Sequence, residues 1–152
     1  PKVAGQHPDY IFKQLTDYKA GNRENAQMSP MAAPLTEQEM RDLAAYYAAQ
    51  TQTAGAADPA LAELGEQIYR AGNPQNGVPA CSGCHGPAGL GINVAKFPRI
   101  SGQHADYTKQ TLTHFRAGER GNDPNSMMRG AAARMTDQEI AAVAQYLQGL
   151  GN

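Results

Sequence analysis

Two cysteines and a histidine form the most chemically specific group in this sequence of 152 residues. Cys81 and Cys84 are the only cysteines of the chain, and His85 directly follows the second. Two thiols at this spacing can form thioether bonds with the vinyl groups of a porphyrin, and the adjacent imidazole can reach the iron from one side. We therefore predict covalent attachment of a c-type haem at Cys81 and Cys84, with His85 as an axial ligand.

Other uses of this motif fit the sequence less well. A structural zinc site usually needs four Cys or His ligands in two clusters, whereas His7, His104 and His114 are scattered and no second cysteine pair exists. A thioredoxin-like centre would need a βαβ pattern nearby, and none is present. A disulfide between the two cysteines would leave His85 unexplained.

The second iron ligand must come from far along the chain, because the ring lies between two sides of its pocket. The candidates are His104, His114, Met127, Met128 and Met135. A methionine thioether favours ferrous iron and raises the reduction potential. Met127 and Met128 end a loop rich in turn residues, and filling gaps in a hydrophobic core is the alternative role for them.

Two further residues are candidates for supporting the cofactor. The carbonyl group of Pro98 can accept a hydrogen bond from Nδ1 of His85 and orient the ring, although a simple turn proline is equally compatible with the spacing. Arg129 can pair with a haem propionate, and a solvated surface arginine is the alternative.

Composition and periodicity predict an all-α protein. Alanine is abundant, tryptophan is absent, and the net charge of −1 gives no reason to expect nucleic acid as a partner. The spacing of apolar residues and the capping signals predict helices at 6–20, 37–49, 103–117 and after Thr136, and another between Asp58 and Gly72. No apolar run is long enough to span a membrane.

An internal repeat organises the sequence. Residues 2–26 and 99–123 are identical at 11 of 25 positions at an offset of 97, and residues 28–47 and 128–147 at 8 of 20 positions at an offset of 100. The second alignment pairs Met28 with Met128 and leaves Met127 without a counterpart, which favours Met128 as the iron ligand. Two copies of this length indicate duplicated domains. We expect residues 1–50 to be the C-terminal part of a first domain, 51–57 a linker, and 58–152 a complete second domain.

This combination closely resembles the cytochrome c4 family of dihaem, class I c-type cytochromes. The resemblance rests on the Cys81–His85 motif, the duplication, Tyr107, and residues 98–103, 115–118, 122–123, 128–129 and 140–150. It implies two all-α cytochrome c class I domains, the first lacking its N-terminal haem-attachment segment in residues 1–152. It also implies His and Met ligands for each haem, namely His85 and Met128 in the second domain and Met28 for a second haem. Pro98, Ile100, Tyr107 and Arg129 are expected at the cofactor.

The resemblance further implies a periplasmic electron carrier and not an enzyme. Family members are often membrane-associated and pass electrons to terminal oxidases, so we expect a quinol–cytochrome c reductase as donor and a terminal oxidase as acceptor. Two alternatives stay open: a cytochrome subunit of a sulfur-compound dehydrogenase, and a haem protein in which a displaceable methionine permits catalysis or gas sensing.

Overall fold

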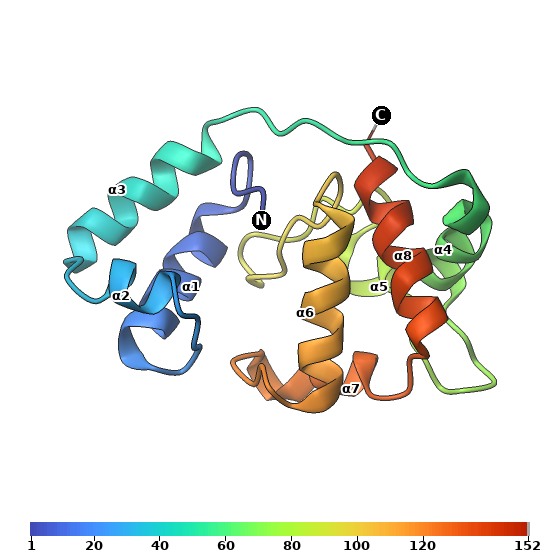
Figure 1. The fold of residues 1–152 in the computed structure, drawn as a ribbon. Coiled ribbons are helices and arrows are strands. Elements are labelled where there is room, and N and C mark those ends of the chain that lie inside the picture. The colour runs from blue at the N-terminus through green and yellow to red at the C-terminus, as the bar shows by residue number, and fades with distance from the viewer. Residues whose placement is uncertain (152) are drawn as a thin grey trace.

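The computed structural model describes residues 1–151, and helices are the regular elements in this part of the chain (Figure 1). They are α1 (Pro8–Ala20), α2 (Met28–Ala32), α3 (Glu37–Ala48), α4 (Pro59–Ala71), α5 (Ser82–His85), α6 (Ala105–Ala117), the 3₁₀ helix η1 (Pro124–Ser126), α7 (Met127–Ala132) and α8 (Asp137–Gly149). Isolated β-bridges join Asn73 to Val78 and Ile92 to Phe97. The prediction of an all-α chain is confirmed.

The helices form two groups, each with its own hydrophobic cluster. In Figure 1, α1, α2 and α3 lie together on one side, and α4 to α8 lie on the other. The first cluster contains Ile11, Leu15, Tyr18 and Met40, and Met28 packs against it. An extended segment connects α3 with α4 across the top of the molecule in this view, and the main chain of Gly55 donates a hydrogen bond to the carbonyl oxygen of Gln148 on its way (2.9 Å).

Helix boundaries follow the capping chemistry of the sequence. Thr36 and Thr136 each form a capping box with the glutamate three residues later, so α3 and α8 begin where expected. Asp58 caps α4 by accepting a hydrogen bond from the main chain of Ala60. The helices predicted at 6–20 and 103–117 begin two residues later than expected, at Pro8 and Ala105, because the preceding Gly-Gln-His turn is not helical.

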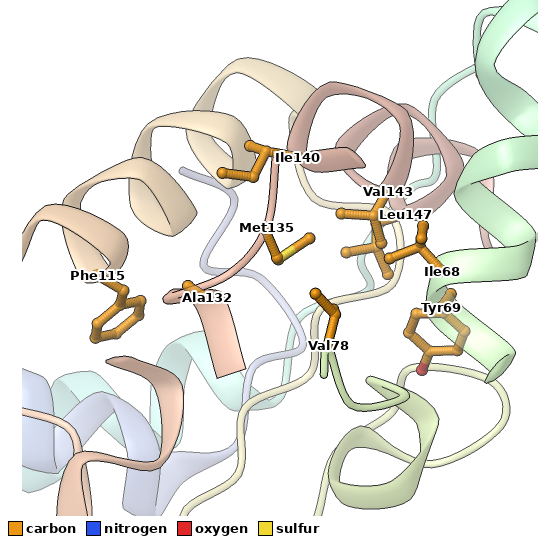
Figure 2. Packing of buried hydrophobic residues seen from close by; sticks show 9 residues of the cluster. All are labelled: Ile68, Tyr69, Val78, Phe115, Ala132, Met135, Ile140, Val143 and Leu147. Atoms are coloured by element: carbon orange, nitrogen blue, oxygen red, sulfur yellow. The ribbon is translucent and has the colours of Figure 1, made fainter. Parts of the chain in front are cut away.

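The larger group is built on a close crossing of α4 and α8. Figure 2 shows Ile68 and Tyr69 of α4 facing Val143 and Leu147 of α8, all of them buried. The crossing is close because α4 presents Gly65 to α8. A β-carbon at this position would lie 2.2 Å from the carbonyl oxygen of Ala142.

The loop that leads into α7 is strained and tied down. Asn125 and Ser126 have φ angles of 53° and 55°, a left-handed conformation that is costly for residues other than glycine. The carboxylate of Asp123 accepts hydrogen bonds from the main-chain N–H of Arg129 (2.9 Å) and from its Nε (2.7 Å). These two hydrogen bonds connect Asp123 with Arg129 and so hold both ends of the segment that contains Met127 and Met128.

We expect Gly65→Ala to destabilise the fold by about 3 kcal/mol, because the added methyl group forces α4 away from the main chain of α8. Chemical unfolding followed by circular dichroism measures this loss. Gly130→Ala is the matched control, since no atom other than those of its chain neighbours and of the nearby backbone of its own helix lies within 4 Å of the added carbon. It should be neutral or should stabilise the protein by up to about 1 kcal/mol. Equal stability of the two variants would contradict the close crossing.

Asp123→Asn should reduce the free energy of unfolding at pH 7 by about 1 kcal/mol, because the pair is partly exposed on the arginine side. Burial raises the pKa of Asp123, but the hydrogen bonds from Arg129 outweigh burial and hold the pKa below its ordinary value. The stabilisation is therefore present above about pH 4 and is lost as the pH falls through the lowered pKa. Unfolding curves of both proteins should converge in acid; a constant difference down to pH 2 would contradict this role.

Candidate haem-attachment site

Cys81 is the N-cap of the short helix α5, and Cys84 lies within this helix. The main-chain N–H of His85 donates to the carbonyl oxygen of Cys81 (3.0 Å), so one helical turn brings the two ends of the motif together. Both thiols are free, Cys81 half-buried and Cys84 exposed. Burial raises the pKa of the Cys81 thiol to about 11, so it is protonated at neutral pH in the chain without cofactor.

The imidazole of His85 is held in one orientation. The side chain is 6% exposed, and its Nδ1 lies 2.9 Å from the carbonyl oxygen of Pro98, as predicted for a metal-binding histidine. Because the carbonyl group can only accept, Nδ1 carries the proton and Nε2 has the lone pair. Burial lowers the pKa of His85 and favours the neutral imidazole, which is the form that binds a metal ion.

The structure separates the candidate second ligands by their surroundings. Met128 is half-buried and packs against the hydrophobic cluster that Cys81 and Ile100 also contact. Met127 is 40% exposed, and Met135 is buried within the cluster itself. His104 is exposed at the start of α6.

Two of the predicted cofactor contacts have partners within the chain. Nε of Arg129 forms the ion pair with Asp123. A contact between Arg129 and a haem propionate therefore stays a prediction, and it would have to use the other N–H groups of the guanidinium. The hydroxyl group of Tyr107 accepts a hydrogen bond from Arg23 of the other helix group (3.1 Å).

The sequence analysis missed the polar network between the two helix groups. Arg23 bonds to Tyr107, and Arg120 bonds to Tyr10 at the same distance of 3.1 Å. Both guanidinium groups also donate to Oε1 of Gln14. Burial raises the pKa of Tyr107, but Arg23 and Arg120 outweigh burial and lower it.

This network was visible in the sequence only as matched positions of the repeat. Arg23 and Arg120 are equivalent at the offset of 97, as are Tyr10 and Tyr107. Neither arginine forms an ion pair with a carboxylate of residues 1–151. Two half-buried cations without a carboxylate partner fit a cofactor that carries carboxylate groups.

The donor set suits a haem better than a bare metal ion. Within residues 1–151, no three side chains of His, Cys, Asp or Glu gather into a metal-binding group. Two free thiols, an oriented imidazole and a nearby thioether match the attachment and ligation of a c-type haem. Among the helices that the structure describes, none is long and apolar enough to cross a bilayer.

Comparison with known proteins agrees with this assignment. The family model described as cytochrome c matches residues 62–151. Cytochrome c4 of Thiocapsa roseopersicina is 72% identical over 151 residues, covering 99% of this chain and 78% of the relative. A protein of Stutzerimonas stutzeri named thiosulfate dehydrogenase electron acceptor is 39% identical over 154 residues, covering 99% of this chain and 71% of the relative.

A solved structure gives the same result for the fold. The crystal structure of reduced recombinant cytochrome c4 from Pseudomonas stutzeri superimposes with a TM-score of 0.95 at 45% identity, covering 98% of this chain and 84% of that chain. The presence of Cys81 and Cys84 within the matched cytochrome c domain implies covalent haem c. The chain belongs to the cytochrome c4 family of class I c-type cytochromes, which are electron carriers with redox proteins as partners and not enzymes.

Proposed function

We propose that Cys81 and Cys84 hold a haem through thioether bonds and that Nε2 of His85 and the sulfur of Met128 bind its iron. The observation that supports this most directly is the fixed imidazole: Pro98 occupies Nδ1 and leaves Nε2 for the metal. The haem supplies one-electron chemistry, cycling between ferric and ferrous iron. Because His85 and Met128 would both be bound to the iron, the protein would leave no position for a substrate and would serve only to carry the electron.

Within this proposal, the surrounding residues fix the positions of the iron ligands and limit their contact with water. The Asp123–Arg129 pair and the strained turn between them fix the start of α7, from which Met128 projects. Ile100 packs beside Cys81 against the hydrophobic cluster. A half-buried thioether and a buried imidazole favour ferrous iron relative to ligands in water.

We further propose that residues 1–50 are the C-terminal part of another cytochrome c domain, that residues 51–57 link it to the second domain, and that Met28 binds a second iron there. Met28 is half-buried on a cluster that resembles the surroundings of Met128, and it occupies the equivalent repeat position. The attachment motif for this haem would lie outside residues 1–152. Arg23 and Arg120 lie between the two groups, where their guanidinium groups suit the propionates of a haem.

As physiological role we propose a periplasmic shuttle that takes electrons from a quinol–cytochrome c reductase and delivers them to a terminal oxidase. The similarity to cytochrome c4 proteins over nearly the whole chain supports this choice. The relative named thiosulfate dehydrogenase electron acceptor supports a second candidate, in which the donor oxidises a sulfur compound. Stopped-flow reduction by each purified donor separates the two: the physiological donor should reduce the haem within milliseconds, the other orders of magnitude more slowly.

Met128→Ala should lower the reduction potential and allow CO to bind the ferrous protein, because the thioether that stabilises ferrous iron is removed. Optical spectra with and without CO, together with a potentiometric titration, measure both effects. Met127→Ala is the matched control and should retain the parental potential and resist CO. The opposite result would transfer the ligand role to Met127, and CO binding by the unaltered protein would support the gas-sensing alternative.

Met28→Ala, made in the protein as it is produced with its complete N-terminus, should lower the potential of one haem and leave that of the Met128 haem unchanged. Intact-protein mass spectrometry should first show two covalent porphyrins. A mass that corresponds to one porphyrin, or a Met28→Ala variant with two unaltered potentials, would contradict the second site.

A further inference from the structure

The side chain of Gln6 reaches from the first helix group to the main chain of the second. Its Oε1 accepts a hydrogen bond from the main-chain N–H of Arg99, and its Nε2 donates to the carbonyl oxygen of Arg99, both at 2.8 Å. Gln6 is thus paired with one residue of the loop that follows the cysteine motif. The two residues are 93 positions apart in the chain.

The N–H group of Arg99 belongs to the same peptide unit as the carbonyl group of Pro98. That carbonyl oxygen accepts the hydrogen bond from Nδ1 of His85 (2.9 Å). The imidazole, one peptide group and the Gln6 amide therefore form a continuous chain of hydrogen bonds. A hydrogen bond at the N–H end of an amide polarises its carbonyl group and makes the oxygen a stronger acceptor.

We propose that Gln6 is a positioning residue for His85 and tunes its iron across the boundary between the two helix groups. By polarising the Pro98–Arg99 peptide, Gln6 strengthens the hydrogen bond from Nδ1 and increases the electron density on the imidazole. A more electron-rich ligand stabilises ferric iron. This inference rests on the proposed role of His85 as an axial ligand.

The same arrangement occurs a second time with the groups exchanged. Oε1 of Gln103 accepts from the main-chain N–H of Lys2 (2.7 Å), and its Nε2 donates to the carbonyl oxygen of Lys2 (2.9 Å). Lys2 follows Pro1 as Arg99 follows Pro98, and the two glutamines are equivalent in the repeat. Each glutamine therefore holds the Pro-X peptide of the opposite group.

Both glutamines are placed by the same local geometry. Gly5 and Gly102 precede them with φ angles of 69° and 70°. The N–H groups of these glycines bind the carbonyl oxygens of Tyr47 and Leu147 near the ends of α3 and α8. This anchoring fixes the direction in which each glutamine crosses.

Other contacts hold the loop when the Gln6 amide is removed. Nε2 of His7 lies 2.7 Å from the carbonyl oxygen of Leu90, and Asn93 donates to the carboxylate of Asp9 (2.9 Å). Gln6→Leu therefore removes the polarising acceptor while these two contacts remain. Gln103→Leu removes an equal number of bonds between the groups without touching the Pro98–Arg99 peptide, which makes it the matched control.

The test uses the intact holoprotein. Proton–nitrogen NMR of the ferrous form observes the Nδ1–H signal of His85, and an NMR-monitored redox titration follows its haem. Gln6→Leu should move the Nδ1–H signal upfield, as a weaker hydrogen bond does, and should raise the ferrous-to-ferric ratio at the parental midpoint about twofold. Gln103→Leu should change neither quantity for this haem.

Three results would overturn the inference: an unshifted His85 signal in Gln6→Leu, an unshifted midpoint, or equal shifts in both leucine variants. If Gln6→Leu does not fold, Gln6→Glu retains the acceptor and strengthens it, so its midpoint must fall below the parental value; a raised or unchanged midpoint counts against the proposal. Absence of a haem-shifted His85 signal in the unaltered protein would instead refute the ligand role of His85 itself.

Discussion

The hydrogen bond between Nδ1 of His85 and the carbonyl oxygen of Pro98 is the constraint on which the site depends. A buried imidazole must have a partner for its N–H, and this partner fixes both the tautomer and the direction of Nε2. The loop formed by residues 86–98 must therefore fold back so that Pro98 lies beside His85 at the end of α5. This requires the main chain at Gly91 to pass close to Phe97: a β-carbon on Gly91 would lie 2.4 Å from the carbonyl oxygen of Phe97, so no larger residue fits there.

The sequence repeat explains why this loop is supported from the other helix group. Because the two groups meet through equivalent positions of the repeat, a glutamine that reaches across in one direction has a counterpart in the other. The Arg23–Tyr107 and Arg120–Tyr10 pairs follow the same rule as the two glutamines. Hydrogen bonds from these side chains connect the two helix groups. The hydrogen bonds of Gln6 therefore support the Pro98–Arg99 peptide and connect the two helix groups at the same time.

The local parts of this structure could be predicted from the sequence, because they depend on near neighbours. The capping boxes at Thr36 and Thr136 and the glycines that end α1 and α6 follow from spacing along the chain. Pro98 was a candidate partner of His85 on the sequence, and the structure decides for it over a simple turn proline. The short helix α2 was missed, since short elements have weak periodicity, and the start of α6 was placed two residues early because the Gly-Gln-His turn before it is not helical. Contacts between the units could not be derived, because nothing in the spacing of Gln6 and Arg99 indicates that they meet. The identical Gly-Gln-His of both copies was the available signal, but it marks equivalent positions of the repeat without indicating a contact across the boundary.

The boundary is nevertheless not electrostatically symmetric. Asp17 is buried there, bound to Lys13 and to the side-chain amide of Asn122 in the other unit. The equivalent positions of the second copy are His114 and Gln110, so no carboxylate–ammonium pair is repeated on that side. Interactions between charges are strong where water is excluded, and equivalent groups on the two sides therefore experience different potentials. Differences at two positions of α6 are therefore enough to make the two sides of the boundary electrostatically distinct, while the reciprocal hydrogen bonds of the two glutamines are the same on both sides.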